Sequence, residues 1–185
     1  MSCYVIVSGL PAAGKSTVAA AVSSVSSLTL FDKDAYLEAL FATTVPSTPK
    51  DRARLSRAAD ESLRAAVEAA EGGVVASWWK HPASHEDSGT PTSWLQELPG
   101  PVVEVYCRCP PEIAARRFLQ RARHPGHFDN RWSLDELCYR FERAARQGPL
   151  GLNPRIEVDT SADINPSTVW PLIQQTVYGH TPQKH

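Results

Sequence analysis

The sequence predicts a three-layer α/β fold, in which helices cover both faces of a five-stranded parallel β-sheet. Five short runs of β-branched and other apolar residues alternate along the chain with segments of helical periodicity. Strands separated by helices form right-handed crossovers, which make the strands parallel. A chain of 185 residues suits one domain with a sizeable core. We therefore expect a single domain over residues 1–178, followed by a flexible tail over residues 179–185.

The first strand and the first helix enclose a glycine-rich loop. Tyr4 to Val7 is a β-branched run typical of a strand, and Thr17 to Val22 has apolar residues at helical spacing. The stretch between them reads GLPAAGKS from Gly9 to Ser16, which matches the G-x-x-x-x-G-K-[ST] phosphate-binding loop. A chance glycine turn would not need a strand before it and a helix after it. The order strand, loop and helix places an anion at the helix N-terminus.

Each part of this loop suits a polyphosphate. Glycines let successive backbone N–H groups converge on the phosphates, and Lys15 reaches the β- and γ-phosphates. The Ser16 hydroxyl can ligate Mg²⁺. The loop therefore predicts a site for a nucleoside triphosphate and Mg²⁺, with Ser16 as the metal ligand. The residues expected to contact the nucleotide here are Gly9, Pro11, Ala12, Ala13, Gly14, Lys15, Ser16 and Thr17.

The second predicted strand, Leu28 to Phe31, ends in Asp32-Lys33-Asp34, and Ala35 to Phe41 has helical character. Ligands of open α/β sheets bind at the carboxyl ends of the strands, so both aspartates lie where chemistry is expected. Aspartate is also favoured at the N-cap of a helix. We assign the capping role to Asp32 and a role in the site to Asp34.

The next helix is predicted from Asp51 to Glu71 and ends at two glycines. Arginines along it either bind an anionic substrate or form a solvated face, and we keep Arg57 as a candidate substrate contact. The arginines of this helix are Arg52, Arg54, Arg57 and Arg64.

A third predicted strand, Val74 to Trp78, leads into a polar and aromatic segment that extends to Asp87. Paired tryptophans at a strand end are either core residues or a platform for a flat or sugar-like ligand. Consecutive strand residues point to opposite faces, so at most one tryptophan faces the ligand. The candidate ligand contacts in this segment are Trp79, Lys80 and His81.

The fourth predicted strand, Val102 to Tyr106, is followed by a helix that opens with Pro110-Pro111-Glu112. This helix is rich in arginine and runs into a glycine-proline-histidine loop. It is either a solvated helix or a mobile lid whose arginines close on the phosphates, and we favour a lid over about 117–133. Arg117 and Arg121 are expected to share one helix face. Arg121 and Arg123 are candidate nucleotide contacts.

The remaining elements are a helix from Ser133 to Arg146, a fifth strand from Arg155 to Val158 and a last helix from Asn165. Ser133 and Glu136 have the spacing of a capping box. Pro171 is expected in the first turn of the last helix or at a kink.

Composition excludes several classes of protein. The net charge of −1 provides no basic field for an extended nucleic acid. The four cysteines show no disulfide framework, and no apolar run approaches membrane-spanning length. The first residues contain no basic leader segment. We therefore expect a cytoplasmic protein that binds neither nucleic acid nor membranes.

The phosphate loop, the aspartate after the second strand and the arginine-rich segment together resemble the small P-loop kinases. The pattern is most similar to the gluconate and shikimate kinases, chloramphenicol phosphotransferase and the kinase domain of polynucleotide kinase. The resemblance implies a P-loop NTPase fold with strand order 2-3-1-4-5. In that group an aspartate after the second strand acts on the substrate hydroxyl, and Asp34 matches it.

The same resemblance implies further site residues. In gluconate kinases a pair of lid arginines precedes a His-Phe, and Arg117, Arg121 and His127-Phe128 look similar. The segment from Leu137 to Glu142 looks like the helix after that lid, which makes Arg140 a candidate substrate contact. The turn Asp159-Thr160-Ser161 would place Thr160 near the adenine.

One stretch departs from the pattern. Several of these families place an acidic residue or Asp-x-x-Arg at the end of the third strand, whereas this chain has Ser77-Trp78-Trp79-Lys80. This difference argues against a standard gluconate, shikimate or nucleoside monophosphate kinase.

The resulting prediction is an ATP-dependent phosphotransferase that acts on a hydroxyl of a small molecule, such as a sugar, a sugar acid, a nucleoside or an antibiotic. Asp34 is the expected base, and Lys15, Arg117 and Arg121 are the expected catalytic cations. A nucleotide-dependent switch that hydrolyses ATP slowly is one alternative. A polynucleotide 5′-hydroxyl kinase, in which Trp79 stacks on a base, is another.

Overall fold

The five predicted strands form one parallel sheet. The computed structural model describes residues 2–162, 165 and 168–179, and the predicted tail from residue 180 onward lies outside them. The strand order is β2-β3-β1-β4-β5 and every neighbouring pair is parallel, which confirms the predicted fold class and order. The strands are β1 (Tyr4–Gly9), β2 (Leu30–Asp32), β3 (Gly73–Ala76), β4 (Val102–Arg108) and β5 (Arg155–Asp159).

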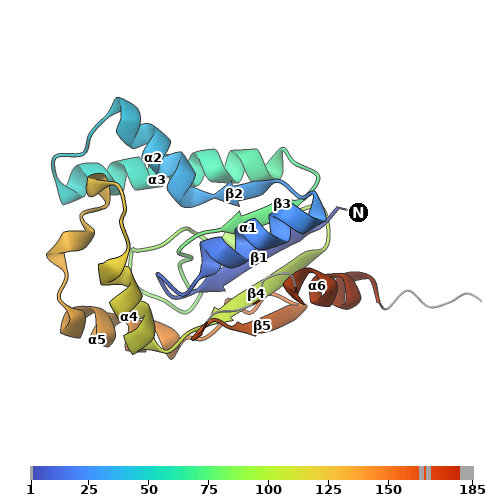
Figure 1. The fold of residues 1–185 in the computed structure, drawn as a ribbon. Coiled ribbons are helices and arrows are strands. Elements are labelled where there is room, and N and C mark those ends of the chain that lie inside the picture. Colours follow the sequence, from blue (N-terminus) through green and yellow to red (C-terminus); the bar gives the residue numbers. More distant parts are fainter. Residues whose placement is uncertain (1, 163–164, 166–167, 180–185) are drawn as a thin grey trace, which may run out of the picture.

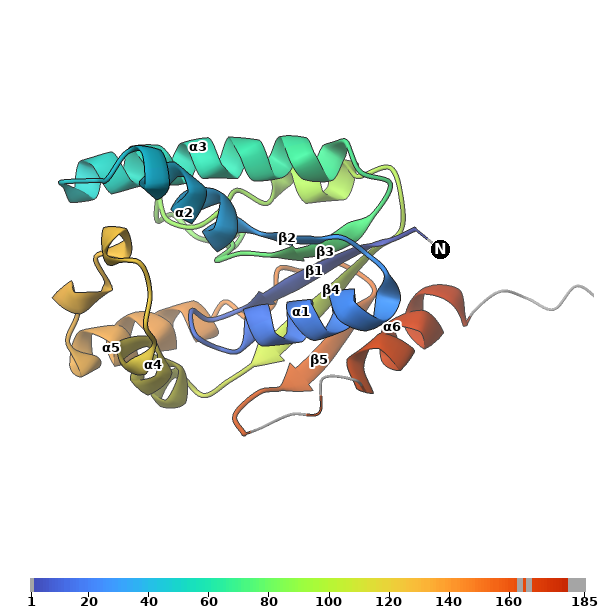
Figure 2. The ribbon, with the colours of Figure 1, turned by 45° about the horizontal axis from the view of Figure 1, so that its top comes forward.

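Helices cover both faces of this sheet, because alternate residues of its strands are buried on opposite sides. Val5 and Val7 of β1 belong to a core that contains residues of α1, α4, α5 and α6. Tyr4 and Ile6 belong to the opposite core, with residues of α3 and a short 3-10 turn, Ser93–Glu97. Figure 2 shows α3 on one side of the sheet, with α1 and α6 on the other. The helices are α1 (Lys15–Ser26), α2 (Lys33–Thr43), α3 (Pro49–Glu68), α4 (Pro111–Gln120), α5 (Leu134–Ala145) and α6 (Val169–Tyr178).

Local capping explains where several helices begin. Asp32 is the N-cap of α2 and accepts a hydrogen bond from the Asp34 amide, as predicted. Ser133 and Glu136 form the predicted capping box of α5. The third helix begins at Pro49, two residues before the predicted start, because Thr48 caps it and Asp51 completes a capping box.

Arg121 is the C-cap of α4. Its N–H still donates to the Arg117 carbonyl oxygen at 3.1 Å, so it lies one turn above Arg117, as the predicted shared face requires. The helix itself stops at Gln120, and with ψ 136° the chain turns away after Arg121. Pro171 lies in the first turn of α6, which is one of its two predicted positions.

The carboxyl ends of the strands open between two pairs of helices. Figure 1 shows α2 and α3 together beside β2, and α4 and α5 together at the other side. The connection between α4 and α5, residues 121–133, contains two short 3-10 turns and extends toward α2. Open α/β sheets bind ligands at this edge. Within the described ranges, no helix has the length and apolarity that crossing a membrane requires.

Candidate active site

The loop from Gly9 to Ser16 has the backbone conformation that its glycines allow. Gly9 has φ 132°, and a Cβ atom there would lie 2.5 Å from the carbonyl oxygen of Cys107. Gly14 is the N-cap of α1 with φ 85°, and Ala12 has a positive φ of 58°. Few side chains tolerate these conformations, so the loop can approach a ligand closely with its backbone.

Lys15 lies folded onto this loop. Its Nζ donates hydrogen bonds to the carbonyl oxygens of Leu10, at 2.7 Å, and Gly9, at 3.1 Å. The side chain is nearly buried, and burial lowers the pKa of Lys15 to about 8. In a loop of this type with bound nucleotide, the lysine ammonium donates to phosphate oxygens instead of these carbonyl oxygens.

Most of the predicted nucleotide contacts line one cleft with Lys15. Ala13 is the exception, because its side chain is fully buried and its N–H donates to Leu10. Thr160 lines the cleft beside Gly14, where a Cβ on the glycine would lie 3.6 Å from the threonine Cβ. The other predicted contacts that line the cleft are Gly9, Pro11, Ala12, Gly14, Ser16, Thr17, Arg121 and Arg123.

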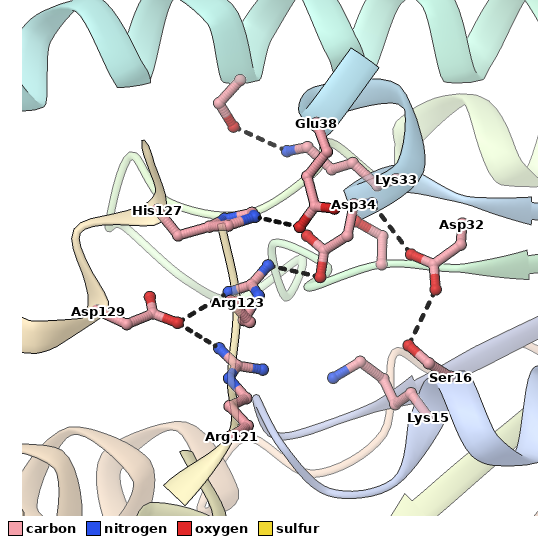
Figure 3. Close-up of polar contacts among 12 residues, drawn as sticks. Lys15, Ser16, Asp32, Lys33, Asp34, Glu38, Arg121, Arg123, His127 and Asp129 are labelled. Carbon is pink, nitrogen blue, oxygen red and sulfur yellow. Dashed lines mark hydrogen bonds and ion pairs between the residues drawn. The ribbon is translucent and has the colours of Figure 1, made fainter. Parts of the chain in front are cut away.

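Ser16 and Asp32 form a pair at the start of α1. The Ser16 hydroxyl donates to Asp32 Oδ2 at 2.9 Å, while Asp32 Oδ1 accepts from the Asp34 amide at 3.0 Å (Figure 3). Burial raises the pKa of Asp32, and these two hydrogen bonds oppose that rise. A hydroxyl and a carboxylate oxygen next to a phosphate loop are the ligand types that Mg²⁺ prefers. The two residues therefore fit a magnesium ion bound with the nucleotide.

Asp34 faces the arginines of the 121–133 segment. Arg123 forms an ion pair of 2.5 Å with the Asp34 carboxylate and another of 3.1 Å with Asp129. Arg121 binds the same Asp129 oxygen at 3.1 Å. Figure 3 shows Lys15, Arg121, Arg123 and Asp34 directed into a common space. One carboxylate and three cations thus converge beside the phosphate loop.

The tip of the segment rests on α2. His127 Nε2 is 2.9 Å from Glu38 Oε1, and the histidine side chain is completely buried against Phe41. Burial lowers the pKa of His127, and the charge of Arg123 lowers it further. The Phe41 ring also stacks on His124, with the ring centroids 5.1 Å apart. These contacts hold residues 121–133 across the cleft.

One protein-family model matches most of the chain. The AAA_33 family model, described as an AAA domain, matches residues 5–143, about three quarters of the chain. The chain belongs to the AAA_33 family. This match includes the phosphate loop, Asp34 and the arginine-rich segment. No curated protein matches the chain in sequence.

Solved structures show the same fold at low sequence identity. A protein from Chloroflexus aurantiacus, named as a kinase without a stated substrate, has a TM-score of 0.74 and 22% identity, with 97% of this chain and 98% of that chain covered. Shikimate kinase from Bacteroides thetaiotaomicron has a TM-score of 0.64 and 17% identity, with 94% and 97% covered. Deoxyadenosine kinase from M. mycoides has a TM-score of 0.53 and 16% identity, with 95% and 99% covered. The AAA_33 chain therefore has the fold of the small P-loop kinases, as its motifs predicted.

Arg117 occupies a different place from the predicted one. Its guanidinium donates to the carbonyl oxygens of Thr160, at 2.6 Å, and Ser161, at 3.0 Å. It therefore braces the turn after β5 rather than facing Asp34. Arg117 lines the cleft, so its predicted action on the transferring phosphate stays a prediction that would require these backbone partners to be exchanged.

The tryptophan prediction is also corrected. Trp79 is only 4% exposed, and its indole N–H donates to the Val7 carbonyl oxygen at 2.9 Å. It therefore belongs to the core and offers almost no surface on which a ligand could stack. Trp78 is the half-buried member of the pair and lines the cleft.

The other predicted substrate contacts line the cleft in different ways. Both ring nitrogens of His81 already bind protein, Nε2 the Pro149 carbonyl oxygen and Nδ1 the Ala83 amide, so His81 braces the cleft wall. Arg57 is exposed and Lys80 is half-buried. The Arg140 guanidinium stacks on the Trp132 ring at 4.5 Å.

A buried polar network supplies the acid that the third strand lacks. Asp60, on α3, accepts from Lys33 Nζ at 2.7 Å and from the Thr90 hydroxyl at 2.7 Å. Thr90 in turn shares a hydrogen bond of 2.5 Å with Ser77, the residue after β3. A carboxylate therefore lies near the end of β3, but it comes from a helix. The sequence contains no local signal for this arrangement, because the partners are far apart along the chain.

Sequence reasoning also missed the charge of the cleft. The cleft encloses about 1310 Å³ and is lined by eleven lysine and arginine side chains against seven aspartates and glutamates. The whole chain has a net charge of −1, so the remaining surface is acidic. Arg52 is the most buried of the α3 arginines in the cleft and was not among the predicted contacts. Folding therefore brings lysines and arginines from distant parts of the chain together in the cleft.

Proposed function

We propose that the protein is an ATP-dependent phosphotransferase that moves the γ-phosphate of ATP to a hydroxyl of a small molecule. The observation that carries the proposal is the position of Asp34, which lies across the cleft from Lys15, with Arg121 and Arg123 directed into the same space from the lid side (Figure 3). A hydroxyl bound beside Asp34 would meet a phosphate held by these cations. Phosphoryl transfer depends mainly on such positioning and charge stabilisation.

The donor half of the reaction is assigned to the phosphate loop. The backbone of the loop and Lys15 would hold the phosphates, and Mg²⁺ held by Ser16, with Asp32 behind it, would neutralise their charge. Thr160 and the turn that Arg117 braces would border the adenine of the nucleotide. Lys15 would exchange its two carbonyl partners for phosphate oxygens as the nucleotide binds.

The acceptor half is assigned to Asp34 and the lid, which we define as residues 121–133. Asp34 would orient the acceptor hydroxyl and receive its proton as the bond to phosphorus forms. In the structure the Asp34 carboxylate forms an ion pair with Arg123, so it is not free to bind an acceptor hydroxyl. A bound γ-phosphate would compete for Arg123, which frees Asp34 for the acceptor. The lid therefore would link the arrival of the donor to the availability of the base.

The test is ADP release with a panel of hydroxyl compounds, measured for the wild type and two variants. Lys15→Ala is expected to lose transfer by at least about a hundredfold, because the lysine stabilises charge on the transferring group. Asp34→Asn should still bind ATP but lose most acceptor-dependent ADP release. Lys50→Ala and Asp135→Asn change exposed residues outside the cleft and serve as matched controls.

The same assay separates the two rival functions. Slow ATP hydrolysis that no hydroxyl compound accelerates would support a nucleotide-dependent switch. Acceleration by oligonucleotides, lost at high salt, would support a polynucleotide kinase. Unchanged turnover in Lys15→Ala would refute the proposed function, and unchanged transfer in Asp34→Asn would remove Asp34 from its role.

A further inference from the structure

Arg52 differs from the other half-buried arginines of the cleft. Within the part of the chain that the structure describes, its side chain has neither an ion pair nor a hydrogen bond, and its buried Nε has no partner. Arg121 and Arg123 bind carboxylates, and Arg117 binds backbone carbonyls. Lys33 is paired with Asp60. Arg52 is therefore a half-buried cation with a buried, unpartnered Nε, and the described residues supply no counterion for it.

Such a group is costly unless something binds it. An unsatisfied buried donor loses its hydration without replacement, and the loss is larger for a charged group. Burial lowers the pKa of Arg52, and the nearby charge of Arg123 lowers it further. The neighbouring carboxylates, Asp34 and Asp129, already bind the lid arginines. An anionic ligand would relieve this cost.

The neighbours of Arg52 place it on the acceptor side of the cleft. Arg52 lies in the first turns of α3 and lines the cleft together with Asp34, Arg123 and Asp129. After burial, the groups that affect the pKa of Arg52 most are Arg123, Asp129 and Asp34, so Arg52 lies within electrostatic range of the lid and the proposed base.

The charge balance of the cleft supports the same conclusion. The lining carries four more cationic than anionic side chains. Mg²⁺ with a nucleoside triphosphate brings about two net negative charges, so roughly two positive charges remain for a second ligand. A neutral acceptor would leave this excess, and the half-buried Arg52, uncompensated.

We propose that the acceptor is an anion, and that Arg52 binds its carboxylate or phosphate group while Asp34 binds the reacting hydroxyl. The planar fork of arginine matches the paired oxygens of either group. This inference rests on the proposed function, because it names the class of molecule that receives the phosphate. It makes Arg52 a residue that selects charged acceptors over neutral ones.

The experiment measures binding by calorimetry, with a non-hydrolysable imido analogue of ATP and Mg²⁺ present at saturation. The analogue fills the phosphate loop, so an added anion must bind elsewhere. The three probes are D-glycerate, glycerol 3-phosphate and glycerol, which carry a carboxylate, a phosphate and no charge on similar skeletons. The variants are Arg52→Gln, Arg52→Lys and, as a control, Arg54→Gln on the exposed side of α3.

We expect at least one anion to bind the wild type, with glycerol at least tenfold weaker. Arg52→Gln should weaken anion binding by roughly tenfold to a hundredfold, the loss expected for a charge-assisted hydrogen bond. Arg52→Lys should recover part of the loss, and Arg54→Gln should match the wild type. A preference for D-glycerate would identify a carboxylate acceptor, and a preference for glycerol 3-phosphate would identify a phosphorylated one.

Three results would overturn the inference. They are the absence of saturable binding by both anions, equal binding of glycerol, or unchanged anion binding in Arg52→Gln. Weaker binding of the ATP analogue itself in Arg52→Gln would move Arg52 to the nucleotide and would also overturn it. The measurement requires no transfer, so anion binding without acceptor-dependent ADP release would refute only the proposed function.

Discussion

The buried pair of Lys33 and Asp60 allows a quantitative prediction. Lys33 Nζ lies 2.7 Å from Asp60 Oδ1, and the two side chains are 10% and 14% exposed. Asp60→Asn removes the charge but keeps the size and one oxygen, so the variant isolates the electrostatic contribution. Removing one partner of a buried pair typically costs about 3–5 kcal/mol. We expect the lower end, about 3 kcal/mol, because both side chains retain some contact with solvent.

The cost has an upper limit, because Lys33 can release its proton. Deprotonating an ordinary lysine at pH 7 costs about 5 kcal/mol, at 1.36 kcal/mol per pH unit below its usual pKa. Burial already lowers the pKa of Lys33, and loss of Asp60 lowers it further. A group whose pKa falls on folding opposes folding most at low pH and least near its unfolded pKa. The destabilisation by Asp60→Asn should therefore shrink as the pH rises from 7 toward 10.

Thermal unfolding followed by circular dichroism measures this effect. For a chain of this length about 3 kcal/mol corresponds to a fall in Tm of roughly 6–12 °C. Lys33→Met combined with Asp60→Asn removes both charges and should return the stability to within about 1 kcal/mol of the wild type. Glu68→Gln breaks the exposed pair of Arg64 and Glu68 and should cost less than about 0.5 kcal/mol. A loss that neither declines with pH nor is rescued by Lys33→Met would refute this reasoning.

Two further predictions concern the phosphate loop. Because burial lowers the pKa of Lys15 to about 8, ATP affinity should be constant below pH 8 and fall by up to about tenfold per pH unit above it, as followed by calorimetry. An equal fall in Lys15→Arg, which keeps its charge, would contradict this explanation. Gly9→Ala should destabilise the protein in urea unfolding by more than the roughly 1–3 kcal/mol of backbone strain alone, because its Cβ would meet the Cys107 carbonyl oxygen at 2.5 Å. Gly148→Ala, which has φ 73° but no atom within 4 Å of the new Cβ, should show only the strain, so equal losses would count against the steric argument.

Local patterns explain the features that the sequence predicted well. The phosphate loop, the N-cap at Asp32 and the capping box from Ser133 to Glu136 all depend on residues within a few positions of one another. Their geometry follows from φ preferences and from i to i+3 hydrogen bonds, which the sequence displays directly. The alternation of strands and helices likewise predicted the parallel sheet, because crossover handedness limits the possible topologies.

The sequence by itself therefore determined the phosphate loop, whereas only the tertiary structure decided the opposite side of the cleft, to which we assign the acceptor. Thr90 lies 30 positions from Asp60, and His127 lies 89 positions from Glu38, so no local spacing reports either contact. Burial likewise emerges only when elements pack, and packing placed Trp79 in the core and left Arg52 in the cleft without a partner. A side chain's pairing depends on which distant groups surround it, so the sequence could supply the candidate residues but not their partners.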